Sequence, residues 1–386
     1  MGGKVPNGCG GKPAGKNRVS SICTFAGLVS RLRAFIARTA EEARPNSASA
    51  GEFNQLAADL FALQAETVPV YRELCRQRRL SEVTDWREIP ALPVAAFKAY
   101  AISSLPLEER RHVFHSSGTT RHQPSQHFHN DESRTIYEES ARPWFRRHVL
   151  GGAVAAGMKS ILLTPTAAQA PNSSLAHMLD TMRGEFAESV HTGTVDGNGV
   201  WGLDLPATLG ALEAAPSAGG PVALLGTAFS FVHLLDHCRA AQKRFRLAAG
   251  SRAMETGGYK GRGREVAKAE LRQLMTRWLG IPASHIVGEY GMSELSSQAY
   301  DRVAGASEGP FQFPPWARAL VISPETGREC AEGETGMIRV FDLANVRSVL
   351  AVQTEDLGVR RGDGFELAGR AADAGARGCS LRFQEI

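Results

Sequence analysis

Residues 285–295 read His-Ile-Val-Gly-Glu-Tyr-Gly-Met-Ser-Glu-Leu, so a short apolar run stands directly before a polar segment. An apolar run of this kind predicts a buried strand. Gly291 permits a tight turn after it, and Ser293 and Glu294 then place a hydroxyl and a carboxylate side by side. Mg²⁺ that bridges phosphates binds one or two carboxylates together with phosphate oxygens. The stretch therefore suits a phosphate-bound magnesium ion, although a turn with a solvated charge is the more frequent origin of such a segment.

The same strand pattern recurs along the chain and predicts the fold class. From about residue 110 to about residue 305, apolar runs alternate with stretches long enough for helices, which predicts an α/β fold with a largely parallel sheet covered on both faces. Beyond that point, short strands joined by Gly and Pro turns predict a smaller β-rich end. The expected strands are 112–114, 160–163, 222–225, 285–287, 319–322, 336–340 and 364–367, and the expected helices are 25–40, one that begins near Glu52, 131–149, 173–182, 229–240 and 264–278.

The composition bounds the class of protein. With 386 residues, 43% of them hydrophobic and 22% charged, the chain is neither disordered nor a membrane-embedded bundle. We expect a flexible N-terminal extension over 1–45, an α/β body over 46–304 and a β-rich subdomain over 305–386. A net charge of +4 is too weak to indicate a nucleic-acid partner. The six cysteines form no CxxC pair, and no apolar run reaches the roughly 18 residues of a membrane span, so we expect a cytoplasmic protein without a membrane span.

A hydroxyl-rich loop follows the strand expected at 112–114. Residues 115–121 read His-Ser-Ser-Gly-Thr-Thr-Arg, with four hydroxyls and a glycine ahead of a cation. Hydroxyl and backbone N–H donors with one positive charge suit a polyphosphate, and ligands of open α/β sheets bind beyond the carboxyl ends of the strands. An ordinary Ser/Thr turn is the alternative. The candidate phosphate-binding residues are Ser116, Ser117, Gly118, Thr119, Thr120 and Arg121.

A third polar segment lies in the β-rich end. Residues 353–358 read Gln-Thr-Glu-Asp-Leu-Gly, and Gly369 and Arg370 follow the strand expected at 364–367. A carboxylate such as Asp356 can accept hydrogen bonds from both hydroxyls of a ribose, and Arg370 can contact phosphate or ribose oxygens. Taken alone, such a segment is more often a turn that carries a solvated charge.

The order of these three segments resembles the adenylate-forming superfamily, which comprises acyl-CoA synthetases, luciferases and the adenylation domains of peptide synthetases. Such enzymes make an acyl-AMP from a carboxylate and ATP. The sequence is more similar still to the acyl-protein synthetase (LuxE-like) family of the bacterial luciferase fatty acid reductase complex, over about residues 50–386. The stretches that carry this similarity are Thr-Gly-Gly-Tyr-Lys at 256–260, Glu-Tyr-Gly-Met-Ser-Glu-Leu-Ser-Ser-Gln at 289–298 and Arg-Gly-Cys-Ser-Leu at 377–381.

The resemblance implies the large-domain architecture of adenylate-forming enzymes, with mostly parallel sheets and a small β-rich C-terminal subdomain. Typical adenylate-forming enzymes continue into a C-terminal lid domain, which we expect to be lacking here, because only sixteen residues follow Arg370. ATP and Mg²⁺ are the implied cofactors, and a long-chain fatty acid or another carboxylic acid is the implied substrate. The phosphate loop falls on 116–121, with Arg121 where many relatives have glycine. The other implied roles are the adenine pocket for Gly257 and Gly258, stacking on the base for Tyr290 beside Gly291, the α-phosphate and Mg²⁺ for Ser293 and Glu294, the ribose for Asp356 and the hinge for Arg370.

Two further residues are implied in catalysis. In the acyl-protein synthetase family a cysteine near the C-terminus takes the acyl group as a thioester and passes it to a reductase partner, and Cys379 occupies that place here. The thiolate is the nucleophile, so the nearby cation of Arg377 would help it. Lys260 is a candidate for contact with the phosphate or carboxylate, and for the adenylation lysine that the lid otherwise carries; a surface lysine is the alternative. We therefore expect an acyl-CoA reductase-like protein as acyl acceptor.

Two other functions stay open. One is an acyl-CoA or aryl-CoA ligase resembling phenylacetate-CoA ligase, and the other is a non-catalytic scaffold that binds nucleotide. The retained hydroxyl, Glu, Asp and Arg of the motifs argue against a scaffold. Five histidines gather between 112 and 129 in a spacing that matches no zinc site, and His115 adjoins the phosphate loop with its role open. These histidines are His112, His115, His122, His127 and His129.

Overall fold

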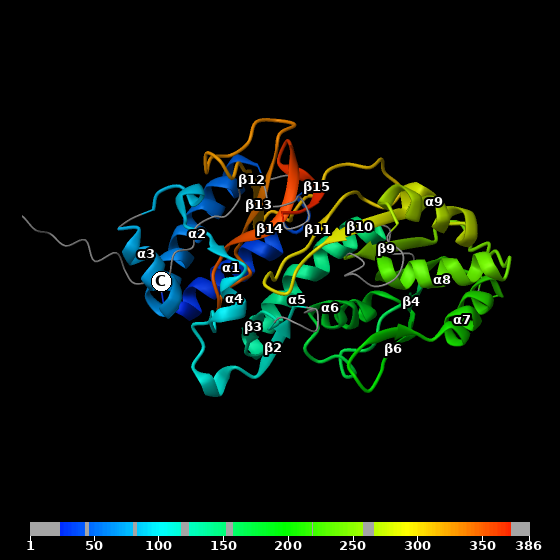
Figure 1. Ribbon diagram of the computed structural model, residues 1–386. Coiled ribbons are helices and arrows are strands. Elements are labelled where there is room, and N and C mark those ends of the chain that lie inside the picture. The colour runs from blue at the N-terminus through cyan, green and yellow to red at the C-terminus, as the bar shows by residue number, and fades with distance from the viewer. Residues whose placement is uncertain are drawn as a thin grey trace, which may run out of the picture.

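The computed structural model describes residues 24–42, 46–79, 83–116, 123–151, 157–217, 219–257 and 266–371. Over these residues, helices pack against two main sheets (Figure 1). The helices are α1 (Phe25–Thr39), α2 (Ser47–Thr67), α3 (Pro69–Gln77), α4 (Ala96–Ala99), α5 (Asp131–Phe145), α6 (Ser174–Met182), α7 (Leu205–Ser217), α8 (Ala228–Ala240) and α9 (Lys268–Leu279). The strands are β1 (Leu92–Pro93), β2 (His112–His115), β3 (Gln126–His129), β4 (Lys159–Leu162), β5 (Glu188–His191), β6 (Gly193–Val195), β7 (Trp201–Leu203), β8 (Val222–Thr227), β9 (Arg252–Thr256), β10 (Ile286–Tyr290), β11 (Ala299–Tyr300), β12 (Ala317–Ile322), β13 (Thr335–Asp342), β14 (Ala351–Arg361) and β15 (Gly364–Arg370).

The larger sheet has the strand order β11-β10-β9-β8-β4-β5, and each pair except β10–β11 is parallel. Alternate residues of β8 face opposite sides of it. Val222 and Leu224 belong to the hydrophobic cluster that includes α7, α8 and α9, whereas Ala223 and Leu225 belong to the cluster that includes α5 and α6. The predicted parallel sheet with helices on both faces is therefore confirmed.

Strand β9 lies inside this sheet, although its sequence did not predict a strand. All five of its residues are buried, but Arg252 and Glu255 interrupt the apolar pattern by which strands are recognised. Both polar side chains find partners inside the protein. Arg252 Nη1 donates to the carbonyl oxygen of Val149 at 3.2 Å, and the Glu255 carboxylate lies 3.5 Å from Arg272 Nη2. These contacts compensate the cost of burying the two charged groups.

The segment 112–114 is extended as predicted, but it is not part of the parallel sheet. Strand β2 instead pairs antiparallel with β3, and the two form a separate two-stranded sheet. Periodicity indicates an extended segment and does not say which strand it pairs with. Helix α5 then begins as predicted at Asp131, where the Asn130 side chain accepts from the Ser133 N–H and the Ser133 hydroxyl accepts from the Asn130 N–H.

The β-rich end forms the second sheet. Strands β12, β13, β14 and β15 pair antiparallel, and β14 lies between β13 and β1. Strands β12, β13 and β15 were predicted, whereas the turn expected around Asp356 is wrong, because this residue lies within the long strand β14. The parallel pairing of β1 with β14 was not predicted. Figure 1 shows the orange and red strands of this sheet beside the blue N-terminal helices α1 and α2. Trp86 packs edge-on to Phe53 of α2 and to Phe341 of β13, with ring centroids 5.6 and 4.8 Å apart, and so joins the two ends of the chain.

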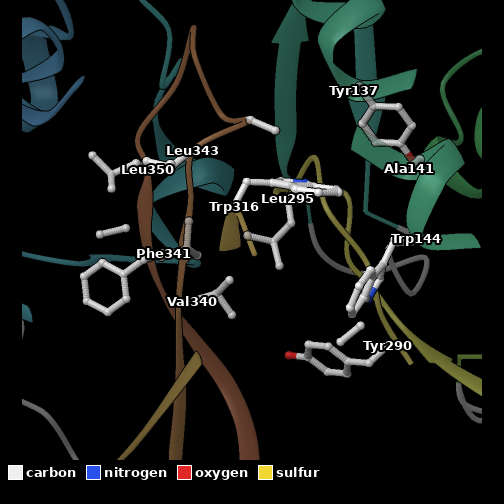
Figure 2. Packing of buried hydrophobic residues seen from close by; sticks show 14 of the residues in the cluster. Tyr137, Ala141, Trp144, Tyr290, Leu295, Trp316, Val340, Phe341, Leu343 and Leu350 are labelled. Carbon is white, nitrogen blue, oxygen red and sulfur yellow. The ribbon is translucent and has the colours of Figure 1, made fainter. Parts of the chain in front are cut away.

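One hydrophobic cluster is shared by the N-terminal helices, α5 and the C-terminal sheet (Figure 2). Trp316 lies at its centre and is fully buried. Its indole N–H donates to Ser140 Oγ at 2.7 Å, and its ring meets that of Trp144 at 6.4 Å between centroids. Since Ser140 and Trp144 belong to α5, this residue attaches the C-terminal part of the chain to the helix that covers the larger sheet.

Helix α1 corrects the prediction of a flexible extension over 1–45. The helix itself was expected at 25–40, but six of its residues are buried, five of them in the shared cluster, and Arg33 forms an ion pair with Glu139 of α5. The described part of this stretch is therefore packed against the body. Helix α2 begins at Ser47 rather than near Glu52, because the Asn46 side chain caps it before the apolar pattern starts. None of the described helices is both long enough and apolar enough to cross a membrane.

Candidate active site

The two ends of the hydroxyl-rich loop are held together beside Glu294. The Ser125 N–H donates to Ser116 Oγ at 2.9 Å, and the Ser116 N–H donates to the Ser125 carbonyl oxygen at 3.3 Å. The Ser125 hydroxyl in turn donates to the Glu294 carboxylate. The first and second motifs therefore meet through Ser125, a residue that no sequence pattern indicated.

Glu294 is a buried carboxylate, 2% exposed. Burial raises the pKa of Glu294, whereas the hydrogen bonds from Ser125 and Ser293 and the charge of Lys98 act in the opposite direction. A cation placed against this group would favour its ionised form. Within the described ranges, no group of three or more His, Cys, Asp or Glu side chains could hold a metal ion by itself. One carboxylate beside the Ser293 hydroxyl fits magnesium, which takes most of its ligands from phosphates and water.

Asp342 fixes the segment that carries Ser293 and Glu294. The N–H groups of Ser296 and Ser297 both donate to Asp342 Oδ2 at 2.8 Å, and the Ser297 hydroxyl donates to Oδ1 at 2.7 Å. Asn345 Nδ2 donates to the carbonyl oxygen of Glu294 at 3.0 Å. Because Asp342 is the last residue of β13, the C-terminal sheet positions the end of β10. A single Asp after an apolar strand carries no sequence signal for this role.

Tyr290, Asp356 and Arg370 form a second cluster. The Tyr290 hydroxyl donates to Asp356 Oδ2 at 2.9 Å, and Arg370 Nε lies 3.3 Å from Asp356 Oδ1. Asp356 and Arg370 face each other in the β14–β15 register. Burial, followed by the charge of Asp356, raises the pKa of Tyr290 well above its ordinary value, so this phenol is a neutral donor. The Tyr290 ring packs among Phe311, Phe313 and Phe365, with centroids 6.1, 6.3 and 5.1 Å away.

Two predicted site residues, Gly257 and Gly291, are glycines for different structural reasons. Gly257 follows β9 with a φ of +69°, a left-handed conformation that favours glycine. A tight turn follows Gly291 as predicted, because the Leu295 N–H donates to the Met292 carbonyl oxygen at 3.1 Å, although Gly291 itself has no positive φ. A Cβ at position 291 would lie 2.4 Å from Glu289 Oε1, so another residue there would force the Glu289 side chain to shift.

Glu289 is a further site residue to which the sequence assigned no role. Thr256 and Glu289 face each other at the ends of β9 and β10, and the Thr256 hydroxyl donates to the Glu289 carboxylate. Burial raises the pKa of Glu289 to about 7, against the hydrogen bond from Thr256 and with a contribution from the charge of Glu255. Near neutral pH the group is therefore partly protonated, and it lies next to both Tyr290 and Gly291.

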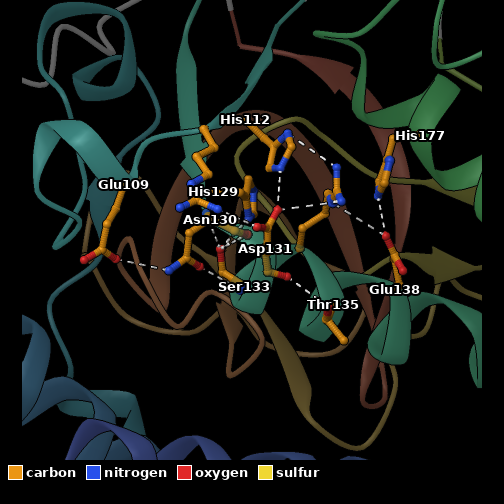
Figure 3. A network of polar contacts seen from close by, with 11 residues as sticks. Glu109, His112, His129, Asn130, Asp131, Ser133, Thr135, Glu138 and His177 are labelled. Carbon is orange, nitrogen blue, oxygen red and sulfur yellow. Dashed lines mark hydrogen bonds and ion pairs between the residues drawn. The ribbon is translucent and has the colours of Figure 1, made fainter.

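The histidines serve hydrogen bonding and packing. His112 Nε2 lies 2.9 Å from Asp131 Oδ1 in the network at the start of α5 (Figure 3). His127 Nδ1 lies 2.9 Å from the Ser293 carbonyl oxygen, and burial lowers the pKa of His127 to about 4, so its ring is neutral. His129 is buried against His127, with ring centroids 4.2 Å apart. The backbone N–H of His115 donates to the Asn172 carbonyl oxygen at 2.8 Å, and burial lowers the pKa of the His115 ring.

The structure describes eight of the residues to which a nucleotide, magnesium or catalytic role was assigned: Ser116, Gly257, Tyr290, Gly291, Ser293, Glu294, Asp356 and Arg370. They gather where β9 and β10 end and where β14 meets β15. The predicted positions outside the described residues are Ser117, Gly118, Thr119, Thr120, Arg121, His122, Gly258, Lys260 and Cys379.

Comparisons with known proteins agree with this geometry. The profile of the family described as "Acyl-protein synthetase, LuxE" matches residues 45–386. A Vibrio harveyi protein named "Long-chain-fatty-acid–luciferin-component ligase" is 22% identical over 328 residues, which cover 82% of each chain. The protein of the same name from Aliivibrio fischeri is 22% identical over 360 residues, covering 86% of this chain and 88% of its own.

Solved structures show the same fold. An open conformation of 2-hydroxyisobutyryl-CoA ligase, in complex with 2-HIB-AMP and CoA, matches with a TM-score of 0.57 and 13% identity. The match covers 86% of this chain and 80% of that protein. The chain thus has the fold that adenylate-forming ligases share, as its motifs predicted.

Proposed function

The chain belongs to the acyl-protein synthetase (LuxE) family, and from that premise we propose that it is a ligase that activates a long-chain fatty acid with ATP. The product of this first step is an acyl-AMP. In the second step the acyl group passes to Cys379 and then to a partner reductase. The related Vibrio and Aliivibrio proteins are named as ligases of long-chain fatty acids, which supports the substrate class.

One observation carries the proposal. The residues to which the resemblance assigns phosphate, magnesium and ribose contacts come from three distant parts of the chain and form two sets of contacts, which the short segment 290–294 joins. Ser116 reaches Glu294 through Ser125, and Tyr290 reaches Asp356 directly. A scaffold without catalytic function would not need a buried carboxylate held next to a hydroxyl-rich loop, since burying that group costs free energy.

The adenylation step follows from these positions. Asp356 would accept hydrogen bonds from the ribose hydroxyls, while the Tyr290 hydroxyl donates to its Oδ2 atom. The hydroxyl-rich loop would donate hydrogen bonds to the phosphates. Glu294 and Ser293 would hold magnesium, which neutralises phosphate charge when bound. A carboxylate oxygen of the fatty acid forms a bond to the α-phosphorus as the bond to the bridging oxygen breaks, and pyrophosphate leaves with that electron pair. Positioning and electrostatic stabilisation supply most of the rate.

The transfer step would use the Cys379 thiolate. The sulfur forms a bond to the acyl carbon, the bond from that carbon to the phosphate oxygen breaks, and AMP leaves. The thiol proton passes to solvent. From Gly369 to Cys379 the chain has ten residues, which fully extended span about 35 Å. A segment of this length can reach an acyl-AMP bound beside Asp356.

Two measurements test the proposal. Exchange of labelled pyrophosphate into ATP, measured with fatty acids of several chain lengths and with aromatic acids, should depend on a long-chain acid. Mass spectrometry after incubation with ATP, Mg²⁺ and the best acid should then show a hydroxylamine-sensitive acyl adduct on Cys379 that the Cys379→Ala variant lacks. Exchange with none of the acids would refute the activation step. Formation of acyl-CoA, with no adduct on Cys379, would refute the proposed acceptor and assign coenzyme A instead.

A further inference from the structure

Lys98 differs from the other lysines of the described chain. The described ranges contain four lysines, and three of them form ion pairs. Lys98 is half-buried and has neither a hydrogen bond nor an ion pair to any residue that the structure describes. A partly desolvated ammonium group without an anionic partner costs free energy unless an anion binds to it. The three pairs are Lys159 with Glu188, Lys243 with Glu213 and Lys268 with Asp301.

The short helix α4 holds Lys98 in a defined place. Strand β1 pairs with β14 at Val352 and Gln353, and the Val94 N–H donates to the Gln353 carbonyl oxygen at 2.9 Å. Helix α4 begins two residues later. It is therefore fastened to β14 close to Asp356, at the edge of the candidate site.

A second contact fixes α4 from the other side. Phe97, which precedes Lys98, is 1% exposed and meets the His127 ring edge-on, with centroids 6.1 Å apart. His127 Nδ1 in turn lies 2.9 Å from the Ser293 carbonyl oxygen. The same histidine thus contacts both the helix that carries Lys98 and the segment that carries Ser293 and Glu294.

The charge of Lys98 acts on Glu294. It favours the ionised form of this carboxyl group against the effect of burial, as do the hydrogen bonds from Ser125 and Ser293. An ammonium group without a partner in the described part of the chain therefore lies within electrostatic range of Glu294. A cation at the position of Lys98 suits the proposed reaction, because the carboxylate of the fatty acid must approach a phosphate of ATP there and both groups are anionic.

We propose that Lys98 is a catalytic residue of adenylation, whose ammonium group contacts the fatty acid carboxylate and an α-phosphate oxygen while the bond between them forms. This inference rests on the proposed function. Lys98 would reduce the repulsion between the two anions and stabilise the negative charge on the phosphate oxygens in the transition state. A compact ammonium group with three donors can contact both oxygens at once. The body of the protein would then supply the lysine for which the sequence suggested Lys260.

The experiment compares three variants with the wild type in fatty-acid-dependent pyrophosphate exchange. Lys98→Met removes the charge and should lower the exchange rate about 100-fold, the usual effect of losing one donor to a developing oxyanion. Lys98→Arg keeps the charge, so its exchange rate should fall by no more than about tenfold. Lys159→Met is the matched control, because Lys159 begins β4, at the end of its strand opposite to the candidate site, and pairs with Glu188. It should retain the wild-type rate.

A binding measurement separates this role from a structural one. Titration calorimetry with an N-acyl sulfamate of adenosine, a non-reactive analogue of acyl-AMP, should show about tenfold or greater weakening in Lys98→Met in buffer with EDTA. The thermal unfolding midpoint should stay at the wild-type value. Lys98→Gln serves as a second uncharged variant if the methionine variant folds poorly.

The outcomes distinguish a failure of the proposed function from a failure of the role assigned to Lys98. Absence of exchange in the wild type with every acid would refute the proposed function and with it the role of Lys98. An active wild type with Lys98→Met and Lys98→Gln within threefold of it would refute the role of Lys98 alone. Equal losses in Lys98→Met and Lys98→Arg, with lowered unfolding midpoints in both, would show that Lys98 serves packing and would also overturn the inference.

Discussion

The carboxylate of Asp342 should be the main support of the candidate site, and its replacement gives a quantitative test. It is fully buried and accepts four hydrogen bonds. Burial raises the pKa of Asp342, and these hydrogen bonds act in the opposite direction. The donors are the N–H groups of Ser296 and Ser297 on Oδ2, and the Ser297 hydroxyl and the Ala344 N–H on Oδ1, at 2.7–3.0 Å.

The hydrogen bonds of Asp342 give the size of the expected loss in the free energy of unfolding. Asp342→Ala leaves three buried N–H groups without an acceptor, whereas the Ser297 hydroxyl can still donate to Ser140 Oγ, 2.9 Å away. At about 1 kcal/mol for each N–H group, the variant should lower the free energy of unfolding by about 3 kcal/mol. Asp342→Asn keeps one oxygen, which can still accept from both serine N–H groups. The Ser297 hydroxyl can rotate to accept from the new amide, so that only the Ala344 N–H loses its acceptor. The asparagine variant should therefore lose about 1–2 kcal/mol.

Urea unfolding, followed by tryptophan fluorescence, measures both losses. Asp363→Asn is the control, because Asp363 is exposed, and it should stay within about 0.5 kcal/mol of the wild type. Since the anchored segment carries Glu294, pyrophosphate exchange in Asp342→Ala should also fall about tenfold or more. Equal losses for the alanine and asparagine variants, or losses no larger than that of the control, would refute this account of how the site is held.

Three further outcomes follow from the same geometry. Gly291→Ala should lower the free energy of unfolding by about 1–3 kcal/mol by overpacking, and adding Glu289→Ala should recover part of this loss in a double-mutant cycle, because the new Cβ meets the Glu289 carboxyl group. The raised pKa of Glu289, about 7, means that its contribution to stability is complete below the unfolded pKa near 4.5 and is lost as the pH rises through 7. The difference in unfolding free energy between wild type and Glu289→Gln should therefore change by about 3 kcal/mol between pH 4.5 and pH 8, and a constant difference would contradict the assignment. Tyr290→Phe removes the hydrogen bond to Asp356 and should weaken AMP binding about fivefold in calorimetry, whereas unchanged affinity would mean that Asp356 does not need this support.

Much of the larger sheet could be predicted from local pattern. Strands β4, β8 and β10 are apolar runs, and α5 begins at a capping motif, so both signals lie within a few consecutive residues. Strand β9 was missed because Arg252 and Glu255 interrupt its apolar run, and their partners come from other elements. The pairing of β1 with β14 was missed for a related reason, since residues 92 and 352 share no local signal.

The candidate site likewise contains residues that local sequence patterns indicated and residues that they did not. The motifs around Ser116, Tyr290 and Asp356 could be recognised because each is a short run of suitable side chains, and the first two stand at the end of a strand. Ser125 and Asp342 could not, because their roles consist of contacts with segments far away in the chain. The tight turn after Gly291 was predicted, whereas the closeness of Gly291 to the Glu289 carboxyl group had no sequence signal.

Side-chain chemistry, hydrophobic periodicity and capping are properties of neighbouring residues, so the amino-acid sequence alone specified the α/β class, the β-rich end and the motifs that carry the family. Burial and proximity are properties of the packed molecule. Only the tertiary structure brings the loop ends to Glu294, raises the pKa of Glu289 by removing water, and leaves Lys98 half-buried beside the site with no partner among the residues that the structure describes. The physical reason is that electrostatic energies depend on desolvation and on distances through space, which separation along the chain does not determine.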